Sequence, residues 1–121
     1  MRPRIATLSV LILALLLATV HGCGGSKSNP VVPPVTLELN SPNLATNGVF
    51  MHTFANAGTF NYHCKFHGGM TGSVTVAGGQ PASASVAIGD NSFSPTSVSV
   101  APGGTVTWTN NGLNTHTVTS N

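Results

Sequence analysis

A short segment near the middle of the chain brings together three side chains that bind soft metal ions. Cys64, His67 and Met70 lie within seven residues and have the spacing Cys-x-x-His-x-x-Met. A thiolate, an imidazole and a thioether are ligands that favour copper, and Gly68 and Gly69 allow a tight loop between them. A loop this short cannot surround an ion alone, so we expect a further ligand from elsewhere in the chain.

A second imidazole would complete the trigonal plane of a copper site, with methionine as a weak axial ligand. The candidates are His52, His63 and His116. His63 is expected to point away from Cys64, because neighbouring side chains of a strand alternate between its two faces. His52 is interpreted as a surface or hydrogen-bonded residue, which is the usual state of a lone histidine. His116 lies shortly after a predicted strand at 104–109.

The domain that must position these ligands is expected to span residues 35–121. It consists of short stretches rich in Val, Thr and Phe, separated by turn residues. Apolar residues alternate in several stretches, as in Val74 and Val76 or Val106 and Trp108, which gives each strand one buried face. The pattern predicts an all-β, antiparallel-rich sandwich or barrel of about seven or eight strands. We expect these strands near 35–40, 49–55, 58–64, 72–77, 84–89, 96–101, 104–109 and 114–119.

Two parts of this domain resemble the copper-binding segments of cupredoxins. Cys64–Met70, followed by Thr71–Val76, resembles the C-terminal copper loop and last strand of that family, and the short ligand spacing is similar to that of amicyanin and pseudoazurin. Pro102–Asn110, with His116 after it, resembles the segment that supplies the first histidine ligand. Asn91–Pro95 resembles an early strand turn of the family, so the resemblance covers nearly the whole predicted domain.

The resemblance implies a cupredoxin-like Greek-key sandwich that binds one copper ion and carries one electron between Cu(I) and Cu(II). The ligands that it implies are His116, Cys64, His67 and, in the axial position, Met70. We also expect His67 to expose one edge of its ring within an apolar patch, where a redox partner protein would dock. That patch would be formed by Phe66, Gly68, Gly69 and Leu113.

The order of the two copper segments is reversed relative to the family, because the histidine segment follows the Cys–His–Met loop. A circular permutant with a join at 77–83 explains this order, and we favour such a monomer because a short join makes closure within one chain easy. A domain-swapped dimer, in which the loop meets His116 of a second copy, is the alternative. A piece of a longer tandem protein is a further alternative.

Thr117 occupies a position at which many cupredoxins have an asparagine that ties the two copper segments together. The threonine side chain is shorter and stiffer, so the sequence predicts a weaker tie. Its backbone N–H is nevertheless expected to donate a hydrogen bond to the Cys64 sulfur and to tune the reduction potential.

Other functions stay open on the sequence alone. Copper storage or delivery in the periplasm would use the same ligands, whereas an adhesion domain of β-sandwich type would need no metal. Zinc is disfavoured because a thioether binds it poorly. An enzyme is not expected, since the ligand set leaves no open coordination position and Glu38 and Asp90 are the only acidic residues.

The first residues predict export. Arg2 and Arg4 precede an apolar run over 8–20, which is shorter than the ~20 residues that cross a bilayer, so 1–22 is interpreted as a signal peptide. Cys23 follows a sequence similar to a lipobox, which predicts lipidation and an anchor in the periplasm or cell envelope. Residues 23–34 are expected to form a flexible tether.

Charge also restricts the partners of the protein. The chain of 121 residues has a net charge of +2, which falls to zero when Arg2 and Arg4 are removed with the signal peptide. This balance gives no basic patch for nucleic acid, and membrane contact is expected only through the lipid anchor. A redox partner would therefore be recognised by apolar contact rather than by long-range charge.

Overall fold

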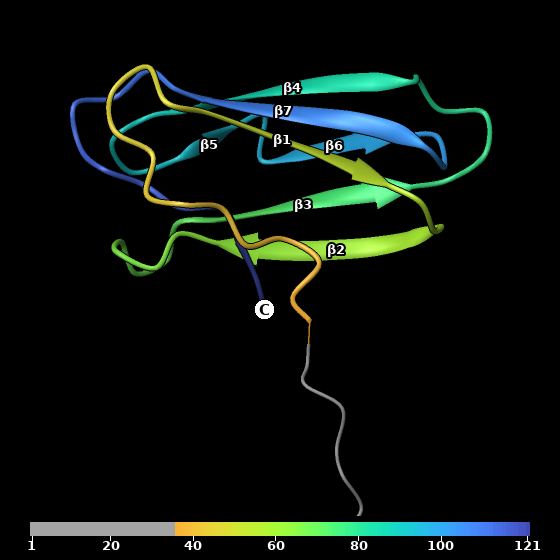
Figure 1. The fold of residues 1–121 in the computed structure, drawn as a ribbon, viewed down its shortest axis with the longest axis horizontal. Coiled ribbons are helices and arrows are strands. Elements are labelled where there is room, and N and C mark those ends of the chain that lie inside the picture. Colours follow the sequence, from red (N-terminus) through yellow and green to blue (C-terminus); the bar gives the residue numbers. More distant parts are fainter. Residues whose placement is uncertain (1–35) are drawn as a thin grey trace, which may run out of the picture. The chain divides into compact units, whose positions relative to one another are not determined.

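The computed structural model describes residues 36–121 (Figure 1). These residues form eight strands, connected by turns and loops, and contain no helix. It follows that these residues include no helix able to cross a membrane. The predicted signal peptide, Cys23 and the tether lie outside the described residues. The strands are β1 (Val49–Phe54), β2 (Gly58–His63), β3 (Thr71–Val76), β4 (Ser83–Ile88), β5 (Phe93–Ser94), β6 (Ser97–Val100), β7 (Gly104–Asn110) and β8 (Thr119–Ser120).

The strands form two four-stranded sheets, with the orders β1-β7-β4-β5 and β6-β3-β2-β8. In Figure 1, β4 and β7 of the first sheet lie above β2 and β3 of the second. Strands β4 and β7 pair in parallel, as do β3 and β6, and the other pairs are antiparallel. The all-β prediction is confirmed, and the arrangement is compatible with a β-sandwich.

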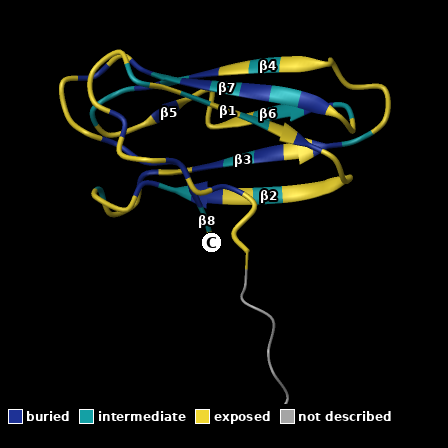
Figure 2. Cartoon of the chain, viewed as in Figure 1, coloured by how far each residue is buried: buried dark blue, intermediate teal, exposed yellow. Residues whose placement is uncertain are grey.

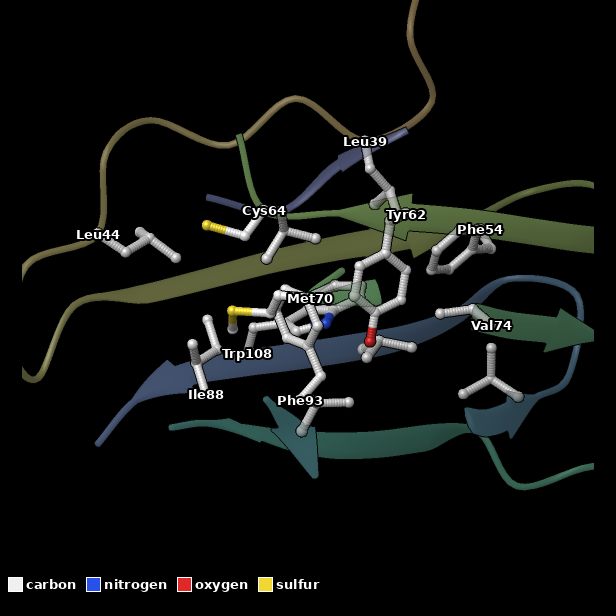
Figure 3. Close-up of a cluster of buried hydrophobic side chains, with 14 of the residues drawn as sticks. Leu39, Leu44, Phe54, Tyr62, Cys64, Met70, Val74, Ile88, Phe93 and Trp108 are labelled. Atoms are coloured by element: carbon white, nitrogen blue, oxygen red, sulfur yellow. The ribbon is translucent and has the colours of Figure 1, made fainter. Parts of the chain in front are cut away.

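The core is built by the alternating apolar residues of the strands. Every second residue of β7 is buried, and Val74 and Val76 are buried on β3 (Figure 2). Tyr62 packs edge-on against Trp108, with ring centroids 5.5 Å apart, and against Phe93 at 4.8 Å (Figure 3). Removal of this apolar surface from water stabilises the pairing of the two faces.

The segments that carry the candidate ligands lie at one end of the molecule (Figure 1). One is the loop Cys64–Met70, which connects β2 to β3, and the other is the segment 111–118, which connects β7 to β8. The join between β3 and β4 lies at the opposite end, where Ala77 N–H donates to the Val100 carbonyl at 3.0 Å. The strands therefore hold both ligand segments at the same edge of the fold.

The residues before β1 run beside the end of the chain and form part of the support for the ligand segments. Leu44 and His116 form an antiparallel bridge in which each backbone N–H donates to the other residue's carbonyl, at 2.8 and 3.0 Å. Ser41 N–H donates to the Val118 carbonyl at 3.0 Å. His116 is thus fixed through its own backbone by a residue 72 positions earlier in the chain.

Two expected strands are wrong in extent. Over 36–40 there is only an isolated bridge at Asn40, and over 114–119 there is only the bridge at His116 before β8 begins. Side chains interrupt the ladder between these two stretches. Leu39 N–H donates to the Ser120 hydroxyl, and Val118 N–H donates to the Ser41 hydroxyl, both at 2.8 Å, so serine replaces the backbone partner.

Strand β5 is the element that the sequence does not predict. It has two residues, Phe93 and Ser94, and pairs antiparallel with the end of β4. Pro95 follows directly, and a proline has no N–H to continue the ladder. So short a strand leaves no period-two pattern to detect, although Phe93 belongs to the buried core.

Candidate metal centre

Three side chains with metal-binding atoms converge at the loop end of the molecule. The ligand atoms of Cys64, His67 and His116 all lie within 4.8 Å of one another. Cys64 and His67 come from the loop after β2, and His116 comes from the segment before β8, so a single chain brings all three together. These residues can hold a metal ion.

The two distances from the Cys64 sulfur match those around one bound ion. The Cys64 sulfur lies 3.5 Å from Nδ1 of His67 and 3.7 Å from Nδ1 of His116. An ion bonded to sulfur at about 2.3 Å and to nitrogen at about 2.0 Å, with about 120° between the bonds, separates the two ligand atoms by about 3.7 Å. Each imidazole therefore lies at a distance from the sulfur that suits two ligands of one ion.

The loop that carries Cys64 and His67 closes on itself. Cys64 N–H donates to the Met70 carbonyl at 3.0 Å, and Met70 N–H donates to the His67 carbonyl at 3.2 Å. Gly69 has a φ of 80°, a left-handed conformation that glycine adopts without steric cost. The loop is thus a compact turn whose two ends are joined before β3 begins.

Met70 is buried at the base of this loop and is 3% exposed. Figure 3 shows the sulfur atoms of Cys64 and Met70 at the same end of the core cluster. The thioether belongs to the same short turn as the thiolate, as the spacing of the sequence predicts. Its role as an axial ligand stays a prediction.

The segment that carries His116 is held by a buried asparagine at the end of β7. The Asn110 side chain donates to the carbonyls of Leu44 and Asn114, at 2.9 and 2.7 Å, and accepts the N–H of Gly112 at 2.9 Å. Both donors and the acceptor of the amide are satisfied, although Asn110 is fully buried. One side chain therefore connects the turn before His116 to the segment that bridges it.

Thr117 ties the two ligand segments together. Its hydroxyl accepts the N–H of Lys65 at 2.9 Å, and its own N–H points to the Cys64 sulfur at 3.5 Å. The expected N–H contact with the sulfur is confirmed, and the shorter side chain still reaches the neighbouring loop. In metal sites, hydrogen bonds of this kind to a ligating sulfur tune the properties of the bound metal.

The environment of His116 favours the neutral imidazole. Burial lowers the pKa of His116, and the neighbouring His67 lowers it further, while the Asp90 carboxylate acts in the opposite direction. The two imidazole rings lie 4.6 Å apart between centroids. Among the described residues, His116 Nε2 is buried without a hydrogen-bond partner, whereas Nδ1 faces the sulfur. A neutral ring with Nδ1 toward the cluster is ready to bind a metal.

His52 and His63, the other two histidines of the described residues, lie outside this cluster. His52 Nε2 pairs with the Glu38 carboxylate at 2.8 Å, and His63 Nδ1 lies 2.6 Å from the Asn121 side-chain oxygen. Both rings are half-buried and have a polar partner of their own. Their positions agree with the surface or hydrogen-bonded interpretation of the sequence.

The residues of the predicted docking patch are all exposed. Phe66 is 53% exposed and Leu113 is 85% exposed, and Gly68 and Gly69 are exposed between them in sequence order. His67 is half-buried, whereas His116 is fully buried. The two imidazoles therefore differ in their access to solvent, and His67 is the one beside the exposed apolar residues of its own loop.

Sequence reasoning missed the residues that hold the His116 segment. Asn110 and Leu44 support it through hydrogen bonds, and Asp90 accepts the N–H groups of Leu113 and Asn114 at 2.6 and 3.1 Å. Asp90 carries one signal that could have been used, because it is one of only two acidic residues in the chain. Asn110 and Leu44 have no such signal, since their partners are backbone groups far away in sequence.

No family model matches this sequence, and no curated protein or solved structure matches the chain.

Proposed function

We propose that the protein is a blue-copper electron carrier of the cupredoxin type, which binds one copper ion through Cys64, His67, His116 and an axial Met70. The observation that carries the proposal is the convergence of two imidazole Nδ1 atoms on one sulfur, at 3.5 and 3.7 Å. One thiolate and two imidazoles, with a thioether in the same turn, are the ligands of blue-copper sites. Zinc sites have no comparable use for the thioether.

Bound copper would supply a one-electron couple between Cu(II) and Cu(I). The chain's part is to keep its ligands in one arrangement, so that little has to move when the charge changes. Backbone hydrogen bonds close the Cys64–Met70 turn, and the Leu44 bridge holds His116. The N–H of Thr117 faces the sulfur and balances part of its charge.

Exclusion of water is the second contribution of the chain. Cys64, Met70 and His116 are each 3% exposed or less, so three of the four proposed ligands are shielded from solvent. His67 is half-buried and would give the electron its route to the surface. Phe66 and Leu113 are exposed apolar residues of the two ligand segments and would provide the contact for a redox partner.

We propose that the copper-binding segments follow one another as in a circularly permuted Greek-key cupredoxin. The protein would function as a monomer. Support for a monomer comes from the cluster itself, since Cys64, His67 and His116 of one chain lie within 4.8 Å of one another. The short join after β3 is hydrogen bonded to the end of β6 and the start of β7, through Ala77 and Ala82. A permuted chain needs such a join where the natural termini of the family would lie.

Export and lipid anchoring at Cys23 complete the proposal and rest on the sequence of residues 1–34. A tether of this composition would hold the copper domain away from a membrane surface. Electron carriers of the cell envelope meet their partners there by diffusion.

A Cu(II) titration of the purified protein, followed by its visible spectrum and by size-exclusion chromatography, tests the proposed function. We expect one equivalent of copper to produce an intense blue monomer. His116→Ala should abolish the colour, and His63→Ala, the matched control, should retain it because His63 lies outside the cluster.

Other results would overturn parts of the proposal. A protein that takes up only colourless Cu(I) would be a storage or delivery protein, and one that binds no metal would fit an adhesion domain. A blue dimer that loses its colour on dilution would replace the permuted monomer with a domain-swapped assembly.

A further inference from the structure

Asp90 lies in the turn between β4 and β5, and its carboxylate reaches the exposed turn before His116. A single oxygen, Oδ1, accepts the N–H of Leu113 at 2.6 Å and the N–H of Asn114 at 3.1 Å. These bonds connect positions 23 and 24 residues apart in the sequence. Hydrogen bonds to an ionised acceptor are roughly twice as strong as those between neutral groups.

Two other side chains hold this turn, since Thr46 donates to the Gly112 carbonyl at 2.9 Å and Asn110 to the Asn114 carbonyl at 2.7 Å, but Asp90 binds the N–H groups of Leu113 and Asn114. Residues 113–115 are exposed and belong to no strand. Gly112 is buried against Asp90, and a Cβ at this glycine would collide with the carboxylate. The contact therefore requires both the acid at 90 and the missing side chain at 112.

Asn114 connects Asp90 to the residues that hold His116, because both of its backbone polar groups are hydrogen bonded. Its N–H is bound by Asp90, and its carbonyl is bound by the side chain of Asn110 at 2.7 Å. Two residues later, His116 enters its bridge with Leu44. The backbone is thus fixed on both sides of Thr115, which sets the position of His116, whose buried ring lies with Nδ1 3.7 Å from the Cys64 sulfur.

We propose that Asp90 is a positioning residue for the His116 ligand, which it holds toward Cys64 through the Leu113–Asn114 turn. The inference rests on the proposed metal site and adds to it a residue that does not itself contact the ion. A group of this kind orients a ligand before the metal arrives, as the outer partners of metal-bound histidines do.

The test compares Asp90→Ala, which removes the acceptor, with Asp90→Asn, which keeps an oxygen in the same place. Glu38→Gln is the matched control, because it removes the other acidic charge at a residue that pairs with His52 instead. In the metal-free protein, amide hydrogen exchange of Leu113 and Asn114 is expected to be faster in Asp90→Ala and near wild type in the other two variants.

Copper affinity provides the second measurement. We expect Asp90→Ala to bind Cu(II) about tenfold to a hundredfold more weakly than wild type and to shift the visible band of the complex. Asp90→Asn should recover most of the affinity, and Glu38→Gln should match wild type. This rescue separates the hydrogen bonds of Asp90 from its charge.

The outcomes distinguish this inference from the proposed function. If wild type binds no Cu(II), the proposed function fails. If wild type binds Cu(II) and Asp90→Ala matches Glu38→Gln in affinity and spectrum, the positioning role is wrong, whatever the exchange rates show. If Asp90→Ala does not fold, an Asp90→Asn variant with wild-type exchange and affinity still supports the role, and one that loses both contradicts it.

Discussion

The two segments that supply the candidate ligands are built in opposite ways. The Cys64–Met70 loop is mainly local, because it contains three of the four proposed ligands and is closed by backbone hydrogen bonds among its own residues, with Thr117 as its tie to the other segment. The segment 111–118 supplies one ligand and is held from outside by Asn110, Leu44 and Asp90. In this site, some ligands are close together in the sequence, whereas the other ligand is brought to them only by the folding of the chain.

The largest effect that distinguishes the segments is expected at Asn110. Asn110→Ala removes the partners of two carbonyls and one N–H in a buried environment, which we expect to destabilise the metal-free protein by about 3 kcal/mol. Urea unfolding measures this loss. The neighbouring Asn111 has an exposed side chain, and Asn111→Ala should change the stability by less than about 0.5 kcal/mol. Equal effects at the two asparagines would contradict the buried hydrogen-bonding role of Asn110.

The two histidines provide the next contrast. His116 is fully buried, so His116→Ala leaves a cavity and should lower the unfolding free energy of the metal-free protein by about 2 kcal/mol. His67 is half-buried in the loop, and His67→Ala should cost less than about 0.5 kcal/mol. Both variants should lose copper, as measured by titration. A His67→Ala variant as unstable as His116→Ala would show that the loop is not independent of the core.

Within the local loop, the strongest single constraint is expected at Gly69. An alanine there has open space for its Cβ but must adopt a φ of 80°, so Gly69→Ala should cost about 1 kcal/mol. Gly68 also has open space and lacks a positive φ, and Gly68→Ala should be close to neutral. Thermal unfolding of the metal-free variants compares them. Identical values would mean that the turn relaxes into another conformation.

The smallest expected effect is a loss of stability at acid pH, and it arises only in the 111–118 segment. The backbone N–H groups of Asn114 and Leu113 hold the pKa of Asp90 below its ordinary value of 3.8. The unfolded chain therefore binds a proton at Asp90 more readily than the folded chain does. Stabilisation by Asp90 is present above about pH 4 and is lost as the pH falls through the lower folded pKa.

Asp90→Asn should reduce this dependence of the unfolding free energy on acid pH, because asparagine does not ionise. Urea unfolding of the metal-free protein between about pH 6 and about pH 2 compares the variant with wild type and with Glu38→Gln. A wild-type profile in Asp90→Asn would mean that the turn does not depend on the ionised carboxylate.

Much of the fold and part of the candidate site could be predicted from the sequence. Alternation in Val74 and Val76, or in Val106 and Trp108, reports burial directly, so the all-β class and most strands were predictable. The cluster of Cys64 and His67 was predictable because only two residues separate these ligands in sequence. His116 needed a resemblance to connect it with them.

What the sequence did not predict depends on backbone partners far along the chain. Ser41 and Ser120 replace strand ladders with side-chain hydrogen bonds, which shortens the expected strands at both ends. Asn110 looks like an ordinary residue at the end of a strand until its three partners are known. Such partners are fixed by tertiary packing, and no local pattern of polarity encodes them.

The central claim is that one ion is held by the sulfur of Cys64 and the imidazoles of His67 and His116. X-ray absorption at the copper edge, on protein loaded with one equivalent of Cu(II), tests it most directly. We expect one short sulfur neighbour and two nitrogen neighbours in wild type, with one nitrogen lost in His116→Ala. A copper environment of nitrogen and oxygen alone, unchanged by His116→Ala, would contradict the claim.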